Sequence, residues 1–223
     1  MYEVKICYNI IMRQRNVKNK QEIINNSNYV ILFPKNLKGK WHEVFQNNHP
    51  IYVEIGMGKG DFLFSNALKY PNINFIGIEK YDSIMALAIK KIDKEYSNLK
   101  LIRMDAKDIN EVFDYEIEKI FLNFSDPWPK PRHSKRRLTS PNFLTKYDSL
   151  FCDKKVIEQK TDNRDLFLYS LISYNECDYK IKEISLDLHH DCDDDIIMTE
   201  YEKKFSKMGQ NIYYVKVEKC SKV

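Results

Sequence analysis

The sequence lacks the features that mark disulfide-rich, zinc-binding and membrane-spanning proteins. Its five cysteines form no C-x-x-C pair and their number is odd, which supports neither a disulfide framework nor a zinc ribbon. Residues 1–20 contain no apolar signal-peptide core. No run approaches the roughly 20 apolar residues that a membrane helix needs. We therefore expect a cytoplasmic protein without a membrane partner.

The composition disfavours a disordered chain. With 223 residues, 43% hydrophobic and 13% aromatic, the chain can bury the core of one large domain. No repeat or linker divides it. Residues 1–28 are polar and basic and predict a flexible arm, followed by a single domain over 29–223. The net charge of +4 is mild, so local basic patches matter more than the total.

From Pro50 onward the pattern alternates short apolar strands with amphipathic helices. Strands are expected at 51–55, 73–78, 99–104, 119–124 and 156–159, and helices at 37–48, 61–70, 82–95, 141–150 and 164–174. Two longer alternating stretches, 179–188 and 211–218, predict an antiparallel pair, with an acidic loop and a short helix at 200–207 between them. This order predicts an α/β fold with a mainly parallel seven-stranded sheet, an antiparallel C-terminal hairpin and helices on both faces.

A glycine-rich turn follows the first predicted strand, with Gly56, Gly58 and Gly60 in alternation. Glycines let the backbone approach a ligand closely and adopt positive φ. The spacing is not the dinucleotide fingerprint, since Asp61 occupies the place of its third glycine. It is not a P-loop either, because Lys59 is not followed by Ser or Thr.

Four carboxylates stand at the ends of four consecutive predicted strands: Glu54, Glu79, Asp105 and Asp126. Because the carboxyl ends of parallel strands meet at one edge, we expect them to line one crevice. Glu54 would repel a pyrophosphate and suits a cationic ligand, while Glu79 can accept both hydroxyls of a ribose. Asp105 is placed to contact an adenine edge. S-adenosylmethionine, a positively charged nucleoside, fits these acids, whereas an NAD-dependent oxidoreductase is disfavoured by Glu54 and Asp61.

The most informative segment runs from Lys119 to Leu138, where an apolar strand ends in Ser125-Asp126-Pro127-Trp128-Pro129. Its prolines remove backbone donors, so the segment can continue neither in the sheet nor as a helix. Asp126 and Trp128 should therefore stand at a rigid mouth, with Trp128 either stacked on a base or packed in the core. Cations suited to phosphate fringe this mouth: Lys130, Arg132, Lys135, Arg136 and Arg137. If five phosphates are neutralised, log affinity for nucleic acid should fall with log salt at a slope of about −3.5 to −4.5.

Taken together, the motifs of this chain resemble those of the bacterial tRNA (guanine-N7-)-methyltransferases. The shared motifs are VEIGMGKG, IGIE, MDA at 104–106, NFSDPWPKPRHSKRRL, KTDN at 160–163 and TEYEKKFSKMGQNIY at 199–213. The resemblance spans residues 12 to about 218 and implies a Rossmann-like fold that transfers a methyl group from S-adenosylmethionine to a guanine N7 in the tRNA variable loop. Residues 1–11 precede Met12, a candidate native start. The family's glycine-rich turn before KTDN is replaced by residues 151–155.

The resemblance also implies roles for individual residues, matched by motif position. The implied cofactor contacts are Glu54, Gly56, Gly58, Glu79, Asp105 and Asp126, with Asp126 also catalytic. The implied substrate contacts are Lys130, Asp162, Thr199, Glu200, Tyr201 and Glu202. The implied RNA contacts are Arg132, His133, Ser134, Lys135, Arg136 and Arg137. Which of Asp126, Asp162 and Glu202 meets the guanine edge stays open, as does the choice between monomer and homodimer.

The same motifs are compatible with two other functions. Asp-Pro-Trp also resembles the motif of enzymes that methylate exocyclic base amines, which makes such an RNA methyltransferase the second hypothesis. A tRNA-binding protein without activity is the third, and the intact acid set argues against it. The segment His189–Asp195 has metal-ligand residue types, but adjacent histidines on a polar loop rarely converge on one ion. An acidic loop and no metal are expected there.

Overall fold

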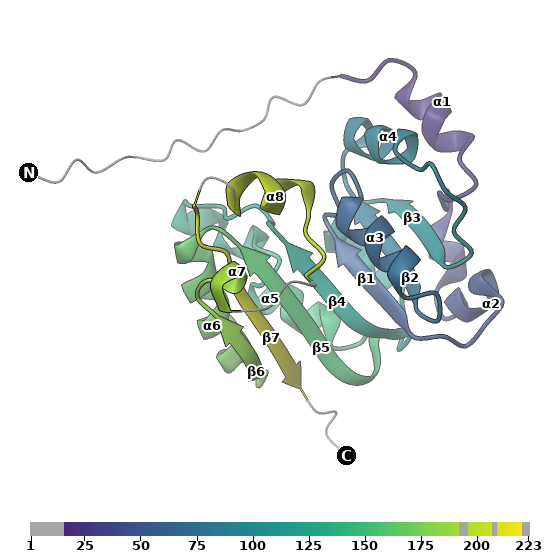
Figure 1. Cartoon of the computed structure of the whole chain (residues 1–223). Coiled ribbons are helices and arrows are strands. Elements are labelled where there is room, and N and C mark those ends of the chain that lie inside the picture. Colours follow the sequence, from purple (N-terminus) through teal and green to yellow (C-terminus); the bar gives the residue numbers. More distant parts are fainter. Residues whose placement is uncertain (1–15, 192–195, 207–208, 220–223) are drawn as a thin grey trace, which may run out of the picture.

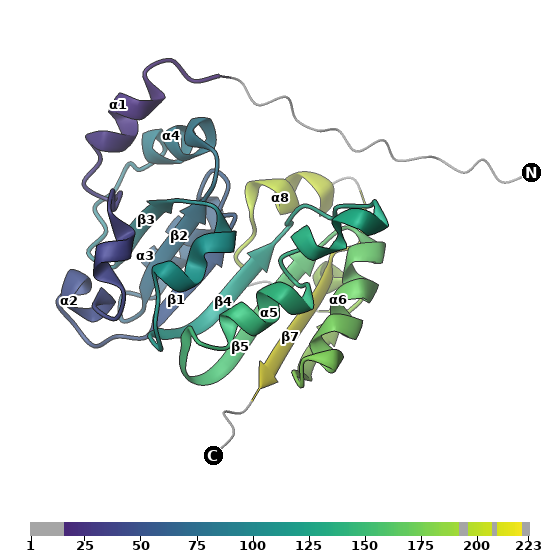
Figure 2. The same ribbon diagram turned by 180° about the vertical axis from the view of Figure 1, so that it is seen from behind.

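The computed structural model describes residues 16–191, 196–206 and 209–219. They form one seven-stranded sheet in the order β3-β2-β1-β4-β5-β7-β6. Helix α3 covers one face (Figure 1), and α5 and α6 cover the other (Figure 2). The strands are β1 Ile51–Ile55, β2 Asn74–Glu79, β3 Leu99–Arg103, β4 Ile117–Asn123, β5 Phe151–Thr161, β6 Lys180–Ser185 and β7 Tyr213–Lys219.

The helices alternate with the strands as the sequence pattern predicts. The α-helices are α1 Lys20–Asn25, α2 Trp41–Phe45, α3 Asp61–Lys69, α4 Asp82–Lys90, α5 Pro141–Tyr147, α6 Arg164–Glu176, α7 Leu188–Asp191 and α8 Glu200–Ser206. Three 3-10 helices join them: η1 Pro34–Leu37, η2 Ala106–Glu111 and η3 Pro131–Arg136. No helix in the described part of the chain is long and apolar enough to cross a membrane.

The predicted fold class is confirmed. Strands β1 to β5 pair in parallel, and β7 lies antiparallel between β5 and β6. The central strands read as apolar runs because helices cover them on both faces. Val53, Ile76 and Ile120 are fully buried in the larger of two hydrophobic clusters. The smaller cluster packs under α3 and α4 around Phe75 and Leu101.

The expected flexible arm is wrong for residues 20–28. Residues 20–25 form α1, which packs against α4 and buries Ile24 to 2% exposure. Val30 then forms a parallel bridge with Leu101 of β3. A short helix with one buried apolar residue leaves no periodic pattern in the sequence. Residues 1–15 of the expected arm lie outside the described residues.

Other boundaries also differ from the prediction. The helix expected at 37–48 is divided into η1 and α2, because Gly39 between them takes a φ of +76°. Strand β5 begins at Phe151 rather than at 156. Phe151 is buried and pairs with Ile117 of β4, but the polar residues 153–155 that follow it interrupt the apolar pattern, and Lys155 pairs with Lys219 of β7. The expected acidic loop begins as the helical turn α7, while residues 192–195 of that loop lie outside the described residues.

Candidate active site at the carboxyl edge of the sheet

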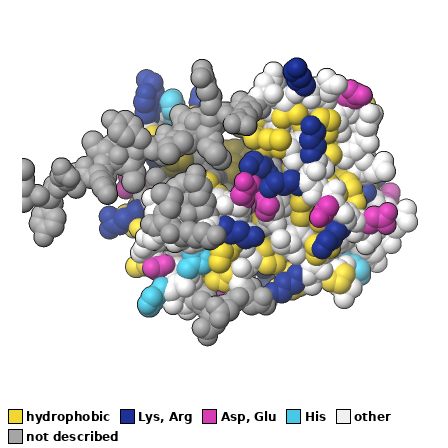
Figure 3. Space-filling model, turned by 45° about the horizontal axis from the view of Figure 1, so that its top comes forward, with side chains coloured by type: hydrophobic (Ala, Val, Ile, Leu, Met, Phe, Trp, Pro, Cys, Tyr) yellow, Lys and Arg dark blue, Asp and Glu magenta, His cyan; other side chains and the backbone are white. Residues whose placement is uncertain are grey.

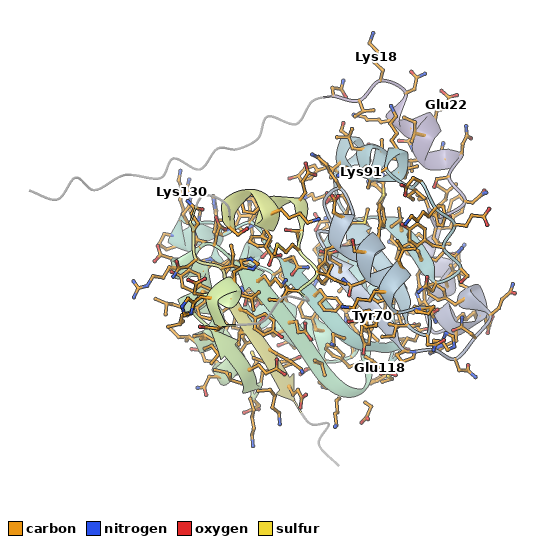
Figure 4. The ribbon with its side chains drawn as sticks, viewed as in Figure 1. Lys18, Glu22, Tyr70, Lys91, Glu118 and Lys130 are labelled. Carbon is orange, nitrogen blue, oxygen red and sulfur yellow. The ribbon has the colours of Figure 1, made fainter. Side chains whose placement is uncertain are left out.

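The four strand-end carboxylates lie at one edge of the sheet. Glu54 of β1 is in register with Gly77 of β2 and Phe121 of β4, and Glu79 of β2 is in register with Arg103 of β3. Asp105 and Asp126 follow β3 and β4 by two and three residues. Strands β4 and β5 point toward this edge, where α8 lies (Figure 1). In Figure 4, Lys130 and Lys91 stand on opposite sides of α8 there, whereas Glu118 lies at the opposite edge.

The glycine turn leaves open space beside its backbone. Gly56 and Gly58 adopt φ of +79° and +59°, and a Cβ added to either would meet no atom within 4 Å. Glu79 braces the turn, because its carboxylate accepts from the backbone N–H of Gly58 at 3.2 Å and of Tyr81 at 2.9 Å. Positive φ favours glycine here, and the open side forms a cradle for a ligand.

Glu54 is 1% exposed, and only one of its two carboxyl oxygens has a hydrogen-bond partner among the described residues. Its Oε1 accepts from Asn123 Nδ2 at 2.9 Å, while its Oε2 has no hydrogen-bond partner among the described residues. Burial raises the pKa of Glu54 to about 8, against the lowering by Asn123 and Lys160. A buried carboxyl oxygen without a partner fits a cationic ligand group, and S-adenosylmethionine carries two such groups.

The other three acids differ in their surroundings. Burial raises the pKa of Glu79, three backbone N–H groups oppose the rise, and the nearby Asp126 charge adds to it. Asp126 itself is exposed at the mouth. Burial alone would raise the pKa of Asp105, but Lys80 at 2.8 Å and the Lys107 N–H lower it overall.

The segment after β4 forms the mouth. Phe124 and Trp128 both take positive φ, at +50° and +43°. The Trp128 indole is half-buried and lies outside the hydrophobic clusters, so it is not a core residue. Its ring meets His133 edge-on at 5.7 Å and lies 4.9 Å beneath the Arg136 guanidinium.

The expected RNA contacts divide into two groups. Arg132, Lys135 and Arg136 are exposed, as is Lys130, which was expected to contact the substrate. His133 and Ser134 are half-buried within η3, and Arg137 points back into the protein. Arg136 also lies close enough to lower the pKa of Lys80, which Asp105 raises. The basic residues therefore extend from β4 toward the cofactor half of the edge.

Several expected substrate contacts instead anchor α8. Thr199 and Glu202 form a capping box, with Glu202 N donating to Thr199 Oγ1 at 2.9 Å and Thr199 N donating to Glu202 Oε2 at 3.1 Å. Glu202 is fully buried and pairs with Lys160 of β5, whose Nζ lies 3.1 Å from its Oε1. His189 Nε2 of α7 lies 3.3 Å from the same oxygen. In this conformation Glu202 has no free face for a base.

Two further expected substrate contacts, Glu200 and Tyr201, lie in the first turn of α8. Glu200 pairs with Lys59 of the glycine turn at 3.0 Å and with Lys91 at 3.1 Å, and Lys91 also pairs with Asp61 at 2.8 Å. Figure 3, which brings this edge forward, shows cationic and acidic side chains adjoining on it. The Tyr201 hydroxyl donates to Asp162 at 3.0 Å. Asp162 remains half-exposed beside the mouth.

A separate trough of about 430 Å³ lies on the sheet face between α3 and α7. Its lining includes Phe62, Tyr52 and Phe121, with the ion pair between Lys119 and Glu158 at 2.8 Å. It meets the edge site only through Asn123 and Lys160, so it is not the crevice that the acids line.

Sequence reasoning missed two polar groups of the site, Asn123 and Lys160. Asn123 is the last residue of β4, and Lys160, the first residue of KTDN, lies near the end of β5. A polar residue at the carboxyl end of a parallel strand is a candidate for the ligand site, and this position could have identified both. Within the described residues no group of three His, Cys, Asp or Glu side chains could hold a metal ion.

Known proteins match this chain over most of its length. Residues 48–215 match the family model described as "Putative methyltransferase". A tRNA (guanine-N(7)-)-methyltransferase of Lachnoclostridium phytofermentans is 50% identical over 91% of this chain and 96% of its own. One from Lysinibacillus sphaericus is 46% identical over 95% of this chain and 100% of its own.

Solved structures with the same fold are far more distant in sequence. An antibiotic-related methyltransferase superposes with a TM-score of 0.61 at 15% identity, covering 82% of this chain and 94% of its own. A 16S rRNA (adenine(1408)-N(1))-methyltransferase of Catenulisporales acidiphilia gives 0.60 at 10% identity, covering 83% and 94%. At these identities the likeness concerns the fold. Taken with the relatives at 46–50% identity, it means that the chain belongs to the family of tRNA (guanine-N7-)-methyltransferases.

Proposed function

We propose that this enzyme transfers a methyl group from S-adenosylmethionine to N7 of a guanine in the variable loop of tRNA. The observation that carries the proposal is the set of acids at one edge, with a buried unpaired carboxyl oxygen on Glu54 and an exposed carboxylate on Asp126. Relatives named as tRNA (guanine-N(7)-)-methyltransferases cover more than nine-tenths of the chain.

The cofactor half of the edge suits a cationic nucleoside. When bound, S-adenosylmethionine supplies an electrophilic methyl group on a positively charged sulfur. Glu54 would balance a positive group of this ligand, and the open side of Gly56 and Gly58 would admit it. Glu79 would meet its ribose and Asp105 its base. Because the Glu79 carboxylate already accepts two backbone N–H bonds, it can meet hydroxyls without moving.

The guanine half needs orientation more than proton transfer. Guanine N7 carries a lone pair and no proton, so no general base is required to free the nucleophile. Positive charge leaves the sulfur and develops on the purine, and a carboxylate close to the ring lowers the energy of that change. Asp126 can accept from the N1–H and N2–H donors of guanine, with charge-assisted hydrogen bonds worth about 1.5–3 kcal/mol each. Lys130, Asp162 and Tyr201 would supply further contacts to the substrate.

The test is to incubate the protein with labelled S-adenosylmethionine and unmodified tRNA, and then treat the product with borohydride and aniline. Methylation at N7 makes the strand cleavable at the modified guanine, and the cleavage site maps it. Label incorporated without cleavage would favour an exocyclic amine instead. Binding of tRNA without any label transfer would contradict the enzymatic proposal.

A further inference from the structure

Arg137 is the member of the basic run that does not face outward. Its Nε donates to the carbonyl oxygen of Pro127 at 2.9 Å, and its Nη2 donates to that of Trp128 at 3.1 Å. The two acceptors are consecutive carbonyls of the mouth segment, directly after Asp126. A guanidinium presents two parallel donors in a fixed fork, which the single ammonium of lysine cannot reproduce.

Arg137 also contacts helix α6. Its guanidinium carbon lies 4.2 Å over the ring of Tyr169. Two residues farther along the chain, Thr139 shares a 2.7 Å hydrogen bond with Ser170 of the same helix, and both side chains are buried. Arg137 therefore links the mouth segment to the rigid back layer of the sheet.

The mouth segment needs such a link because its own backbone is disfavoured. Phe124 and Trp128 on either side of Asp126 take positive φ, which aromatic residues rarely adopt unless their surroundings impose it. The prolines at 127 and 129 remove two backbone donors that could otherwise fix the segment. The guanidinium of Arg137 binds the carbonyl before Trp128 and the carbonyl of Trp128 itself. It therefore holds the backbone on both sides of the residue with the disfavoured φ.

Arg136, the neighbouring residue, has the opposite placement. It is exposed, and its guanidinium lies over the Trp128 ring at 4.9 Å from the ring centroid. Arg136 therefore contacts the Trp128 ring and Arg137 the backbone of the same loop, and of the two only Arg136 is exposed.

We propose that Arg137 is a positioning residue. It donates hydrogen bonds to the Pro127 and Trp128 carbonyls and so orients the Asp126 carboxylate toward the guanine, rather than binding phosphate. The inference rests on the proposed function, since the geometry it protects is that of guanine beside the methyl donor. A misplacement of about 1 Å in such a site can cost about 10²-fold in rate.

The experiment compares Arg137→Ala, Arg137→Lys and Arg136→Ala in steady-state methylation of tRNA. Both Arg137 variants should lose about 10²-fold in kcat. They should keep the KM for tRNA and the Kd for S-adenosylmethionine within about threefold, and the salt dependence of tRNA binding should not change. Arg136→Ala should instead raise KM and reduce the salt slope by about 0.7–0.9.

Lysine is the discriminating substitution. Rescue of kcat by Arg137→Lys, or a raised KM with a flatter salt slope, would overturn the proposal and make Arg137 an RNA contact. Acrylamide quenching gives an independent readout, because Trp41 is fully buried and Trp128 is the only other tryptophan. Quenching should increase in both Arg137 variants. Unchanged quenching together with normal kcat would also overturn it.

Two controls keep the outcome interpretable. If Arg137→Ala does not fold, as judged by circular dichroism, Tyr169→Leu removes the stacking partner while keeping the fork, and it should lower kcat by a smaller factor than Arg137→Lys. A normal kcat in that variant and in Arg137→Lys would contradict the positioning role. Wild-type protein without N7 methylation would instead count against the proposed function itself.

Discussion

At the scale of single residues, the site separates carboxylates by their exposure. Asp126 stands in solvent at the mouth, whereas Glu54 is enclosed beneath the glycine turn with one oxygen unpaired. Burial disfavours the charged form of Glu54 and raises its pKa to about 8. The Asp126 side chain is therefore open to a ligand that enters the mouth, whereas ionisation of Glu54 is favoured when a cation binds beside it.

We expect Asp126→Ala to lose about 10²–10³-fold in kcat, the usual result of removing one preorganised electrostatic partner of a transition state. Stability should change by less than about 0.5 kcal/mol, because the side chain is exposed. Steady-state methylation and urea unfolding measure the two effects. Asp114→Ala, an exposed acid at the opposite edge, is the matched control. Near-normal turnover by Asp126→Ala would remove Asp126 from the reaction centre.

We expect S-adenosylmethionine binding to release a proton from Glu54. Its pKa of about 8 leaves the side chain largely protonated at pH 7, and a cationic ligand favours the ionised form. The release should approach one proton per ligand at pH 7, and affinity should rise by up to about tenfold per pH unit below pH 8. Calorimetry in phosphate and in Tris measures the release.

The Glu54→Gln variant is the control for this linkage. In the unliganded wild type, the folded state keeps a proton that the unfolded chain loses near pH 4.5, so the stability contributed by Glu54 falls as pH rises from about 4.5 through 8. The variant should lack that slope in thermal melts and should bind its ligand without proton release. Equal release by wild type and variant would assign the proton to another group.

At the scale of elements, α8 is tied to the sheet by one buried and one exposed set of charges. The buried pair joins Glu202 to Lys160 across 42 residues of sequence. The exposed pairs join Glu200 to Lys59 and Lys91. Removing one member of a buried pair leaves an uncompensated charge, while exposed pairs are screened by water.

Glu202→Gln should therefore destabilise the protein by about 3–5 kcal/mol. Its neighbour on the same helix, Glu200→Gln, should cost at most about 1 kcal/mol. Free energies of unfolding from urea titrations measure both variants at pH 7. Costs that are equal within error would mean that the Lys160 ammonium finds another buried partner. The assignment of α8 as an element held by the buried pair would then be wrong.

The sequence predicts elements better than the contacts between them. The strand ends at Glu54, Glu79 and Asp126 are readable because apolar runs stop there and polar residues follow. The pairing of Lys160 with Glu202 is not readable, since it depends on how α8 folds back over β5. Similarly, nothing in a run of cations indicates that Arg137 alone turns inward. The α1 helix was missed because Ile24 is its one buried apolar contact.

At the scale of the whole molecule, positive charge is concentrated beside the mouth although the net charge is only +4. With Arg137 committed to backbone carbonyls, four exposed cations remain in the segment after β4: Lys130, Arg132, Lys135 and Arg136. They share the edge with the acids, so RNA held there would have a guanine within reach of Asp126. Phosphate contacts of this kind orient the substrate without reading its sequence.

The salt dependence of tRNA binding counts these contacts. Four neutralised phosphates predict a slope of log affinity against log salt of about −2.8 to −3.6, shallower than expected for five. Combining Arg132→Ala with Lys135→Ala should reduce the slope by about 1.4–1.8 units. The matched control combines Lys38→Ala with Lys40→Ala, which removes two exposed cations beside α2, far from α8 in Figure 1. Filter binding from 50 to about 300 mM salt measures all three proteins, a range over which phosphate contacts weaken strongly. If the control pair reduces the slope as much as the first pair, tRNA covers the opposite edge as well, and the mouth is not the main phosphate-binding surface.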